Sequence, residues 1–163
     1  MRPKDAFFYG VICYNYDQSI ITHQRRFMKK IMVVGAIIVD NNNKIFCAQR
    51  GPGRTLENLW EFPGGKIVEG ETDIQALKRE LAEELKVSVL VKEIVFERTQ
   101  FEYDFGIVNL STFICYLQNE DQPILSEHIA SKWLSIKELE TLNWAPADKP
   151  TVKKLMKTGV LYD

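Results

Sequence analysis

The sequence predicts an α/β fold in which a mixed β-sheet is sandwiched between α-helices. Several segments rich in Val, Ile and aromatic residues, which favour strands, are separated by turn residues. Between them, residues 73–86 carry apolar side chains at three- and four-residue spacing, the period of an amphipathic helix. Helical patterns before and after strands are typical of layered α/β domains. The chain has 163 residues, 45% of them hydrophobic, which is enough for one domain with a buried core.

The first half of the chain predicts a hairpin and then a glycine turn. Residues 31–40 are rich in Val and Ile and predict a buried strand. Three asparagines at 41–43 predict a turn, and residues 44–49 its hairpin partner. A polar loop at 50–54 could reach a ligand. Residues 63–65, Pro-Gly-Gly, predict a tight turn whose backbone can approach a metal or phosphate closely.

The second half predicts one long helix, three strands and two shorter helices. Thr72 followed by Gln75 predicts a capping box, which places the start of the long helix at residue 73. The strands are expected at 88–101, 107–117 and 131–134, the first two as a hairpin, with a polar loop at 118–127. The shorter helices are expected at 135–142 and, with Pro150 in its first turn, up to about 157.

Three carboxylates are expected on one face of the long helix. At 100° per residue, Glu80 and Glu84 lie about 40° apart and Glu83 about 60° beyond Glu80. Like charges at this spacing cost about 0.2–0.5 kcal/mol per pair on an exposed helix, and more where water is excluded. A cation removes that cost, and hard oxygen ligands suit Mg²⁺ or Mn²⁺. The alternative interpretation is a solvated acidic face.

The spacing around these carboxylates resembles the Nudix box of the diphosphate hydrolases. The pattern G-x5-E-x7-R-E-L-x-E-E runs from Gly65 through Glu71 and Arg79 to Glu84, and every charged position is filled. The one departure is Lys86, where the family has glycine. Lysine can adopt the left-handed geometry at a cost of about 1 kcal/mol, or the helix continues for another turn. The departure therefore concerns stability more than chemistry.

The resemblance covers about residues 32–158 and implies the Nudix fold. We expect a Nudix hydrolase domain at 31–160, preceded by an N-terminal extension, 1–30, of unknown role. That extension could be an appended segment, a dimer contact or a start-site artefact. Its basic patch, 25–30, could attract nucleic acid, and the alternative is a solvated tail.

The Nudix resemblance also implies a role for each charged residue of the box. It implies that the metal ligands are Glu80, Glu83, Glu84 and the Gly64 carbonyl. It further implies that Arg79 orients a box carboxylate and that Glu71 braces the site. The alternatives are an ordinary Arg79–Glu83 pair at i,i+4 and a Glu71 charge that only favours the helix N-terminus.

Beyond the box, the sequence resembles the MutT-like branch of the family. The lead-in Glu-Phe-Pro-Gly-Gly-Lys, at 61–66, matches that branch and places Glu61 and Lys66 at the substrate. Arg50 fits the basic residue that meets substrate phosphate; the alternative is a surface arginine. Glu127 lies six residues before Trp133, as does the loop glutamate that joins the metal site in MutT-like enzymes. Alone it would be an exposed loop acid. A base needs a carboxylate near the attacking water, and Glu80 and Glu127 are both candidates.

Asp148 is the residue expected to contact the nucleobase. It lies in Ala-Pro-Ala-Asp-Lys-Pro, where guanine-selective MutT enzymes carry asparagine and the related CTP pyrophosphohydrolases carry Ala-Pro-Ala-Asp. As an ionised carboxylate it would only accept hydrogen bonds. The alternative interpretation is a helix N-cap just before Pro150.

The resemblance implies a Mg²⁺-dependent nucleoside triphosphate pyrophosphohydrolase, with Mn²⁺ as the alternative ion. It would release a nucleoside monophosphate and diphosphate from oxidised or non-standard nucleotides such as 8-oxo-dGTP, or from cytidine-type nucleotides. One alternative is hydrolysis of a nucleoside diphosphate derivative. The other is a non-catalytic Nudix-fold nucleotide sensor, although such proteins usually lose acids of the box.

Composition limits the partners. A net charge of −1 gives no bulk basic field for nucleic acid or an anionic membrane, so we expect no stable nucleic-acid complex and no membrane. The longest apolar run near the start, 6–14, is too short to span a bilayer. Three cysteines lie far apart, which favours a reducing cytoplasm. We expect a monomer or a homodimer acting on a nucleotide substrate.

Overall fold

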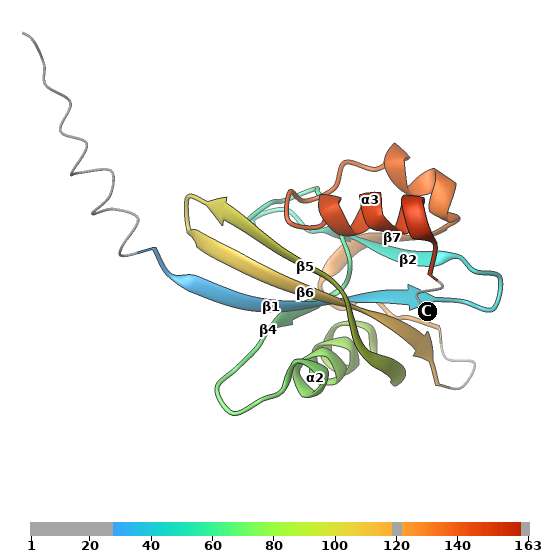
Figure 1. The fold of residues 1–163 in the computed structure, drawn as a ribbon, viewed down its shortest axis with the longest axis horizontal. Coiled ribbons are helices and arrows are strands. Elements are labelled where there is room, and N and C mark those ends of the chain that lie inside the picture. Colours follow the sequence, from blue (N-terminus) through green and yellow to red (C-terminus); the bar gives the residue numbers. More distant parts are fainter. Residues whose placement is uncertain (1–27, 119–121, 161–163) are drawn as a thin grey trace, which may run out of the picture.

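The computed structural model describes residues 28–118 and 122–160, and most of the expected N-terminal extension, 1–30, lies outside them. The described elements form a seven-stranded mixed sheet with helices on its two faces (Figure 1). They are β1 (Lys30–Val39), β2 (Ile45–Arg50), β3 (Trp60–Glu61), β4 (Gly64–Lys66), α2 (Asp73–Leu85), β5 (Val89–Tyr103), β6 (Gly106–Leu117), β7 (His128–Leu134), the 3₁₀ helix η1 (Ile136–Thr141) and α3 (Lys149–Thr158).

Strand β1 lies at the centre of the sheet and connects its two kinds of pairing. It runs parallel to β6 along its whole length and antiparallel to β4, where Gly35 lies opposite Gly64. Strands β5 and β6 form the expected antiparallel hairpin, with bulges between Val91 and Glu97. The parallel pair beside antiparallel ones makes the sheet mixed, so the predicted fold class is confirmed.

The alternation of side chains along β1 builds two cores, one under each helix layer. Val34, Ala36 and Ile38 are buried with the apolar residues of α2, while Ile37 and Val39 are buried with those of η1 and α3. In Figure 1, α2 lies below the sheet and α3 above it. Each face therefore has its own apolar layer, as the sandwich prediction requires.

Helix α2 forms where the sequence placed it, with both predicted ends. The capping box is present: the Thr72 side chain accepts from the Gln75 backbone, and the Gln75 side chain accepts from the Thr72 backbone. The helix ends at Lys86, whose φ of 58° and ψ of 32° are left-handed. Leu77, Leu81 and Leu85 lie on the buried side. Burying a leucine side chain contributes about 1.5–3 kcal/mol, so the helix and its acidic residues are held firmly against the sheet.

One local prediction is wrong, and a second is confirmed with a tighter type of helix. The expected tight turn at 63–65 is in part a strand, β4, which pairs with β1. Gly64 has φ +156°, and a Cβ there would lie 2.1 Å from the Val34 carbonyl oxygen, so only glycine allows this approach. The expected helix at 135–142 is the 3₁₀ helix η1. It is six residues long and buries only Leu139, which gives little apolar surface to support α-helical turns.

The pairing of β2 also differs from a simple hairpin. Only Val39 and Ile45 pair between β1 and β2, whereas β2 pairs with β7 along its length. Strand β7 begins at His128, three residues before the predicted start. These pairings bring the polar loop after β2 next to the residues around Glu127.

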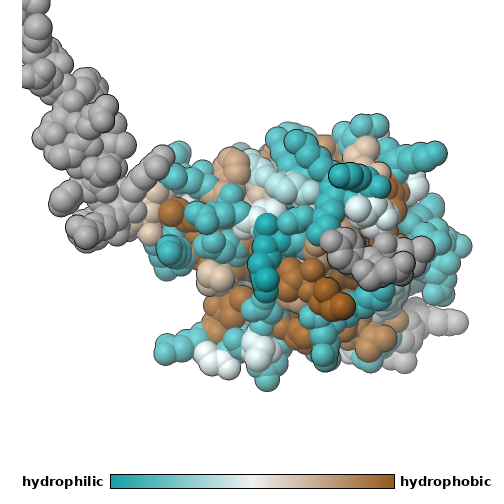
Figure 2. Space-filling model, in the orientation of Figure 1, coloured by the Kyte–Doolittle hydropathy of each residue, from teal (hydrophilic) through white to brown (hydrophobic). Residues whose placement is uncertain are grey.

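The face of the molecule drawn in Figure 2 shows mostly polar side chains with smaller apolar patches. Leu90, Ile94 and Ile124 are among the exposed apolar residues. Scattered exposure of this kind is ordinary for a folded domain. Across the described ranges, no helix combines the length and apolar character needed to cross a bilayer.

Candidate active site

A cavity of about 620 Å³ lies between helix α2, which carries the acidic residues of the box, the loop after β2 and the ends of β5 and β6. This is the size of a typical small-molecule pocket. Most of the predicted site residues line it: Gly64, Glu80, Glu84, Glu127, Arg50, Glu61, Lys66 and Asp148. Three do not, namely Glu71, Arg79 and Glu83. Tyr103, Phe105 and Leu110 add an apolar and aromatic wall.

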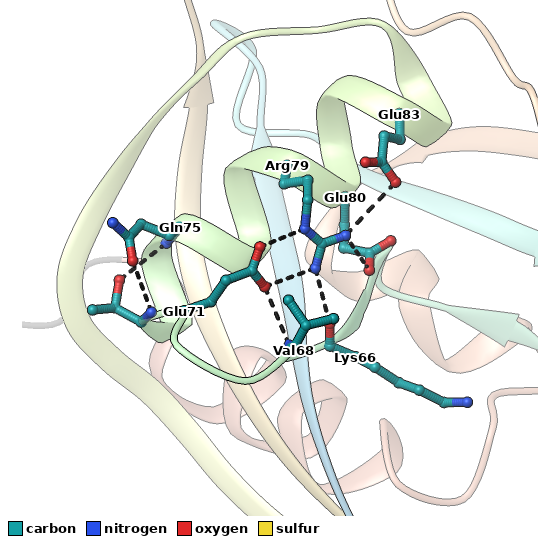
Figure 3. Close-up of polar contacts among 8 residues, drawn as sticks. Lys66, Val68, Glu71, Gln75, Arg79, Glu80 and Glu83 are labelled. Carbon is teal, nitrogen blue, oxygen red and sulfur yellow. Dashed lines mark hydrogen bonds and ion pairs between the residues drawn. The ribbon is translucent and has the colours of Figure 1, made fainter.

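Arg79 does not line the cavity, but it connects the acidic residues of the box to one another (Figure 3). Its guanidinium makes two hydrogen bonds to the Glu71 carboxylate, at 2.6 and 2.8 Å, and a third to Glu80 Oε1 at 2.8 Å. The alternative pair with Glu83 is also present, but at 3.6 Å it is longer. The bonds from Arg79 lower the pKa of Glu71, and its Oε2 also accepts the Val68 backbone N–H. Glu71 therefore does more than place a charge before the helix: it fixes Arg79.

The Glu80 carboxylate lies between Arg79 and strand β4, which contains Gly65. A Cβ on Gly65 would lie 2.3 Å from Glu80 Cδ. Glycine at this position leaves room for the carboxylate in the orientation that it has here, which gives a reason for the first residue of the box pattern. Figure 3 shows Glu80 reaching from α2 toward Arg79, while Glu83 lies one turn further along the helix.

Glu84 has the environment of a carboxylate that lacks its counter-ion. It is 8% exposed, and its Oε2 is buried with no hydrogen-bond partner among the residues that the structure describes. Burial raises the pKa of Glu84 to about 7, and the carboxylates of Glu61 and Glu80 act in the same direction. A buried, unpartnered carboxylate oxygen costs several kcal/mol unless a proton or a cation satisfies it. The donor set thus fits a hard divalent cation.

The expected ligands are not yet gathered around one point. Across the described residues, no three carboxylate, histidine or cysteine side chains are close enough together to hold an ion. The Glu83 side chain is 63% exposed, and Glu80 is bonded to Arg79. Side-chain rotation is therefore needed before these residues can share one cation.

Glu127 is paired across the mouth of the cavity with Arg54. The Arg54 Nη1 to Glu127 Oε2 distance is 2.6 Å, and both side chains are nearly half exposed. This bond lowers the pKa of Glu127. Arg54 belongs to the polar loop that was expected to reach a ligand, but its partner was not predicted, because the pair joins residues 73 positions apart.

Arg50 is oriented by a chain of contacts that includes a residue the sequence did not single out. Arg50 donates from Nε to the Thr55 carbonyl at 2.8 Å and from Nη1 to Glu61 Oε2 at 2.7 Å. His128 Nε2 lies 2.9 Å from Glu61 Oε1, and its side chain is 3% exposed. Glu61 thus contacts Arg50 and His128 with its two oxygens. The only sequence signal for His128 was its position next to Glu127.

Asp148 lies at the start of α3, but its side chain does not cap the helix. The carboxylate turns inward, where Oδ1 accepts the Phe62 backbone N–H at 3.0 Å, and the residue is 6% exposed. Burial raises its pKa well above the ordinary range, and the charge of Glu61 acts in the same direction. The capping interpretation is wrong for the side chain, and the assumption of a permanently ionised carboxylate is also revised: a protonated Asp148 would carry a donor.

The comparison with known proteins is consistent with this geometry. The family model described as "NUDIX domain" matches residues 29–155. The chain is 38% identical to the 8-oxo-dGTP diphosphatase of Haemophilus influenzae over 78% of this chain and 93% of that protein. It is also 38% identical to the CTP pyrophosphohydrolase of Escherichia coli, over 79% and 93%. A solved structure of the DNA mismatch repair protein MutT (family Nudix hydrolase) from methicillin-resistant Staphylococcus aureus 252 is 51% identical, with a TM-score of 0.66 over 81% and 99% of the two chains.

Proposed function

This chain belongs to the Nudix family, and from that premise we propose that it is a Mg²⁺-dependent nucleoside triphosphate pyrophosphohydrolase. It converts a nucleoside triphosphate and water to a nucleoside monophosphate and diphosphate. The observation that carries the proposal is the complete box, with one oxygen of Glu84 buried beside the cavity and without a hydrogen-bond partner among the described residues. Nudix-fold sensors usually lose acids of the box, and this chain keeps every one of them.

The substrate is a damaged or non-standard nucleotide such as 8-oxo-dGTP, or a cytidine-type nucleotide. Two relatives support these two classes, since one is an 8-oxo-dGTP diphosphatase and the other a CTP pyrophosphohydrolase. A cytoplasmic site of action fits a nucleotide substrate. The buried free thiols of Cys47 and Cys115 agree with a reducing compartment.

The metal ligands are drawn from the carboxylates around the cavity mouth. Glu80, Glu83, Glu84 and Glu127 supply carboxylate oxygens and Gly64 its carbonyl, with Mg²⁺ as the ion and Mn²⁺ as the alternative. When bound, the ion neutralises phosphate charge and lowers the pKa of a coordinated water. Its binding requires Glu83 to turn inward and Glu127 to leave Arg54.

The protein groups divide into positioning and substrate contacts. Arg79, fixed by Glu71, holds Glu80 in place. Arg50, fixed by Glu61, presents its remaining N–H groups to the cavity, where they suit phosphate oxygens. Lys66 at the rim supplies a further positive charge. Glu80 and Glu127 are the two candidates for the group that takes a proton from the attacking water.

The test is a product assay over a nucleotide panel. The protein is incubated with CTP, UTP, dGTP, 8-oxo-dGTP and a nucleoside diphosphate sugar, with Mg²⁺, with Mn²⁺ and with a chelator. We expect monophosphate and diphosphate, resolved by ion-exchange chromatography, only when a metal is present. Turnover confined to the diphosphate derivative would favour that alternative, and binding without turnover of any substrate would favour a sensor.

The pair between Arg54 and Glu127 leads to a prediction about metal affinity. If Glu127 is a ligand, Arg54 competes with the ion in the absence of nucleotide. An exposed ion pair is worth about 0.2–1 kcal/mol, so Arg54→Gln should tighten Mn²⁺ binding by up to about fivefold. Mn²⁺ titration followed by electron paramagnetic resonance measures this directly.

The matched control for this prediction is Lys92→Gln. That substitution also removes one positive charge, but from an exposed residue of β5 that does not line the cavity. Equal Mn²⁺ affinities in the Arg54 variant, the Lys92 variant and the parent protein would remove Glu127 from the ligand set.

A further inference from the structure

Tyr103 ends β5 and forms part of the aromatic wall of the cavity. Its ring stacks on Phe105, with centroids 4.9 Å apart and an interplanar angle of 9°. The Phe101 ring also contacts it at a tilt, with centroids 4.6 Å apart. Tyr103 and Phe105 both line the cavity that also holds Asp148. Aromatic faces of this kind are suited to contact a nucleobase.

The Tyr103 hydroxyl has its acceptor side occupied and its proton available. A phenol offers one donor and can also accept. The Ala147 backbone N–H donates to the Tyr103 oxygen at 3.0 Å. Among the residues described, no group accepts the Tyr103 proton. Because the ring lines the cavity, a ligand in the cavity can supply the missing acceptor.

The hydroxyl also lies next to the residue expected to contact the base. Ala147 immediately precedes Asp148, so the bond from its N–H places the Tyr103 oxygen beside the Asp148 segment. Burial raises the pKa of Tyr103 above its ordinary value, so the group stays protonated and remains a donor at neutral pH. A carboxyl group and a phenol thus face the same part of the cavity.

We propose that Tyr103 is a specificity-determining residue that donates a hydrogen bond to a carbonyl oxygen of the nucleobase, beside the Asp148 contact. The proposal rests on the proposed function and extends it by one contact. Guanine, 8-oxoguanine and cytosine carry both a carbonyl acceptor and amino or ring N–H donors. A ligand with both kinds of group can engage Tyr103 and Asp148 together, whereas a ligand without a base engages neither.

Thr99 provides a matched control from the same strand. Its hydroxyl donates to the Ala147 carbonyl at 2.8 Å, so Thr99 and Tyr103 hold opposite sides of one peptide segment. Thr99 does not line the cavity. Thr99→Val and Tyr103→Phe each remove one hydrogen bond to Ala147, but only Tyr103→Phe removes a hydroxyl from the cavity wall.

The experiment measures binding without turnover. Three ligands are titrated calorimetrically in Mg²⁺: the α,β-methylene analogues of dGTP and CTP, and an abasic deoxyribose triphosphate with the same methylene bridge. Tyr103→Phe should weaken binding of the two base-bearing ligands by about two- to tenfold, the worth of one neutral hydrogen bond. Its affinity for the abasic ligand should stay that of the parent protein. Thr99→Val should change none of the three by more than about twofold.

Two outcomes overturn the proposal. Equal losses in Thr99→Val and Tyr103→Phe would mean that Tyr103 acts only by holding Ala147. Equal losses for the abasic and base-bearing ligands in Tyr103→Phe would mean that the hydroxyl does not contact the base. Thermal melting of each variant verifies folding, and Thr99→Ser replaces Thr99→Val if the latter does not fold. Because no turnover is required, a failure of the proposed hydrolysis would be seen separately in the product assay.

Discussion

Substitution of Glu84 or Glu83 by glutamine is expected to lower kcat by about a hundredfold or more, equivalent to about 3 kcal/mol of transition-state stabilisation. Glu84 lines the cavity with a buried oxygen to which no described residue makes a hydrogen bond, and Glu83 lies one position earlier on the same helix. An amide keeps the shape of each side chain but removes the negative charge that a divalent cation requires. The loss should persist at saturating substrate.

The measurement is steady-state kinetics at saturating Mg²⁺, with Mn²⁺ affinity measured in parallel. Glu93→Gln is the matched control, because Glu93 is an exposed residue of β5 outside the cavity, and this variant should keep the parent rate. The Glu84 variant should fold, since burial already disfavours the charged form of this residue. Near-parental turnover in either box variant, with unchanged Mn²⁺ affinity, would show that the metal assignment is wrong.

At pH values where it is ionised, Asp148 is expected to set a base preference of about ten- to a hundredfold in kcat/KM, the worth of one charge-assisted hydrogen bond. When ionised, it only accepts hydrogen bonds, so the amino groups of CTP and dGTP suit it, whereas UTP places its O4 oxygen where an amino donor is needed and should be disfavoured. Asp148→Asn adds an amide donor and should narrow the gap. Asp148→Ala should remove most of it while sparing turnover.

The pH dependence of that preference follows from the raised pKa of Asp148. At pH values below this pKa the carboxyl is neutral and carries a donor, as asparagine does; as pH rises through it, the donor is lost. The CTP-to-UTP ratio of kcat/KM should therefore increase with pH in the parent protein and stay flat in Asp148→Asn. A parallel rise in both proteins would exclude Asp148 as the cause.

The same shift has a consequence for stability that separates this role from helix capping. The folded chain keeps the Asp148 proton to higher pH than the unfolded chain, so this group makes folding less favourable as pH rises above the ordinary carboxyl range. Asp148→Asn removes that penalty and should melt no lower than the parent at neutral pH. If Asp148→Ala only lowered the melting temperature and left the base ratios unchanged, Asp148 would be a structural residue.

The sequence determined the part of this protein whose pattern is local. The capping box at Thr72, the apolar spacing of α2 and the order of its acidic residues follow from contacts three and four positions apart, so the helix and its carboxylates could be placed without coordinates. The run of Val and Ile in 31–40 likewise predicted a buried strand. The box pattern also identified Gly65, although the reason for it, the Glu80 carboxylate where a Cβ would be, was not visible in the sequence.

The tertiary structure alone decided which partners these side chains have. The contacts between Asp148 and Phe62, His128 and Glu61, and Arg54 and Glu127 join residues 86, 67 and 73 positions apart, and they form only because the sheet brings those segments together. The raised pKa of Asp148 also depends on the tertiary structure, because it results from desolvation by the residues that pack around the carboxyl group. The sequence does not show which residues pack around Asp148. The residue could therefore be singled out from its motif, whereas the inward orientation of its side chain and the rise in its pKa could not be predicted.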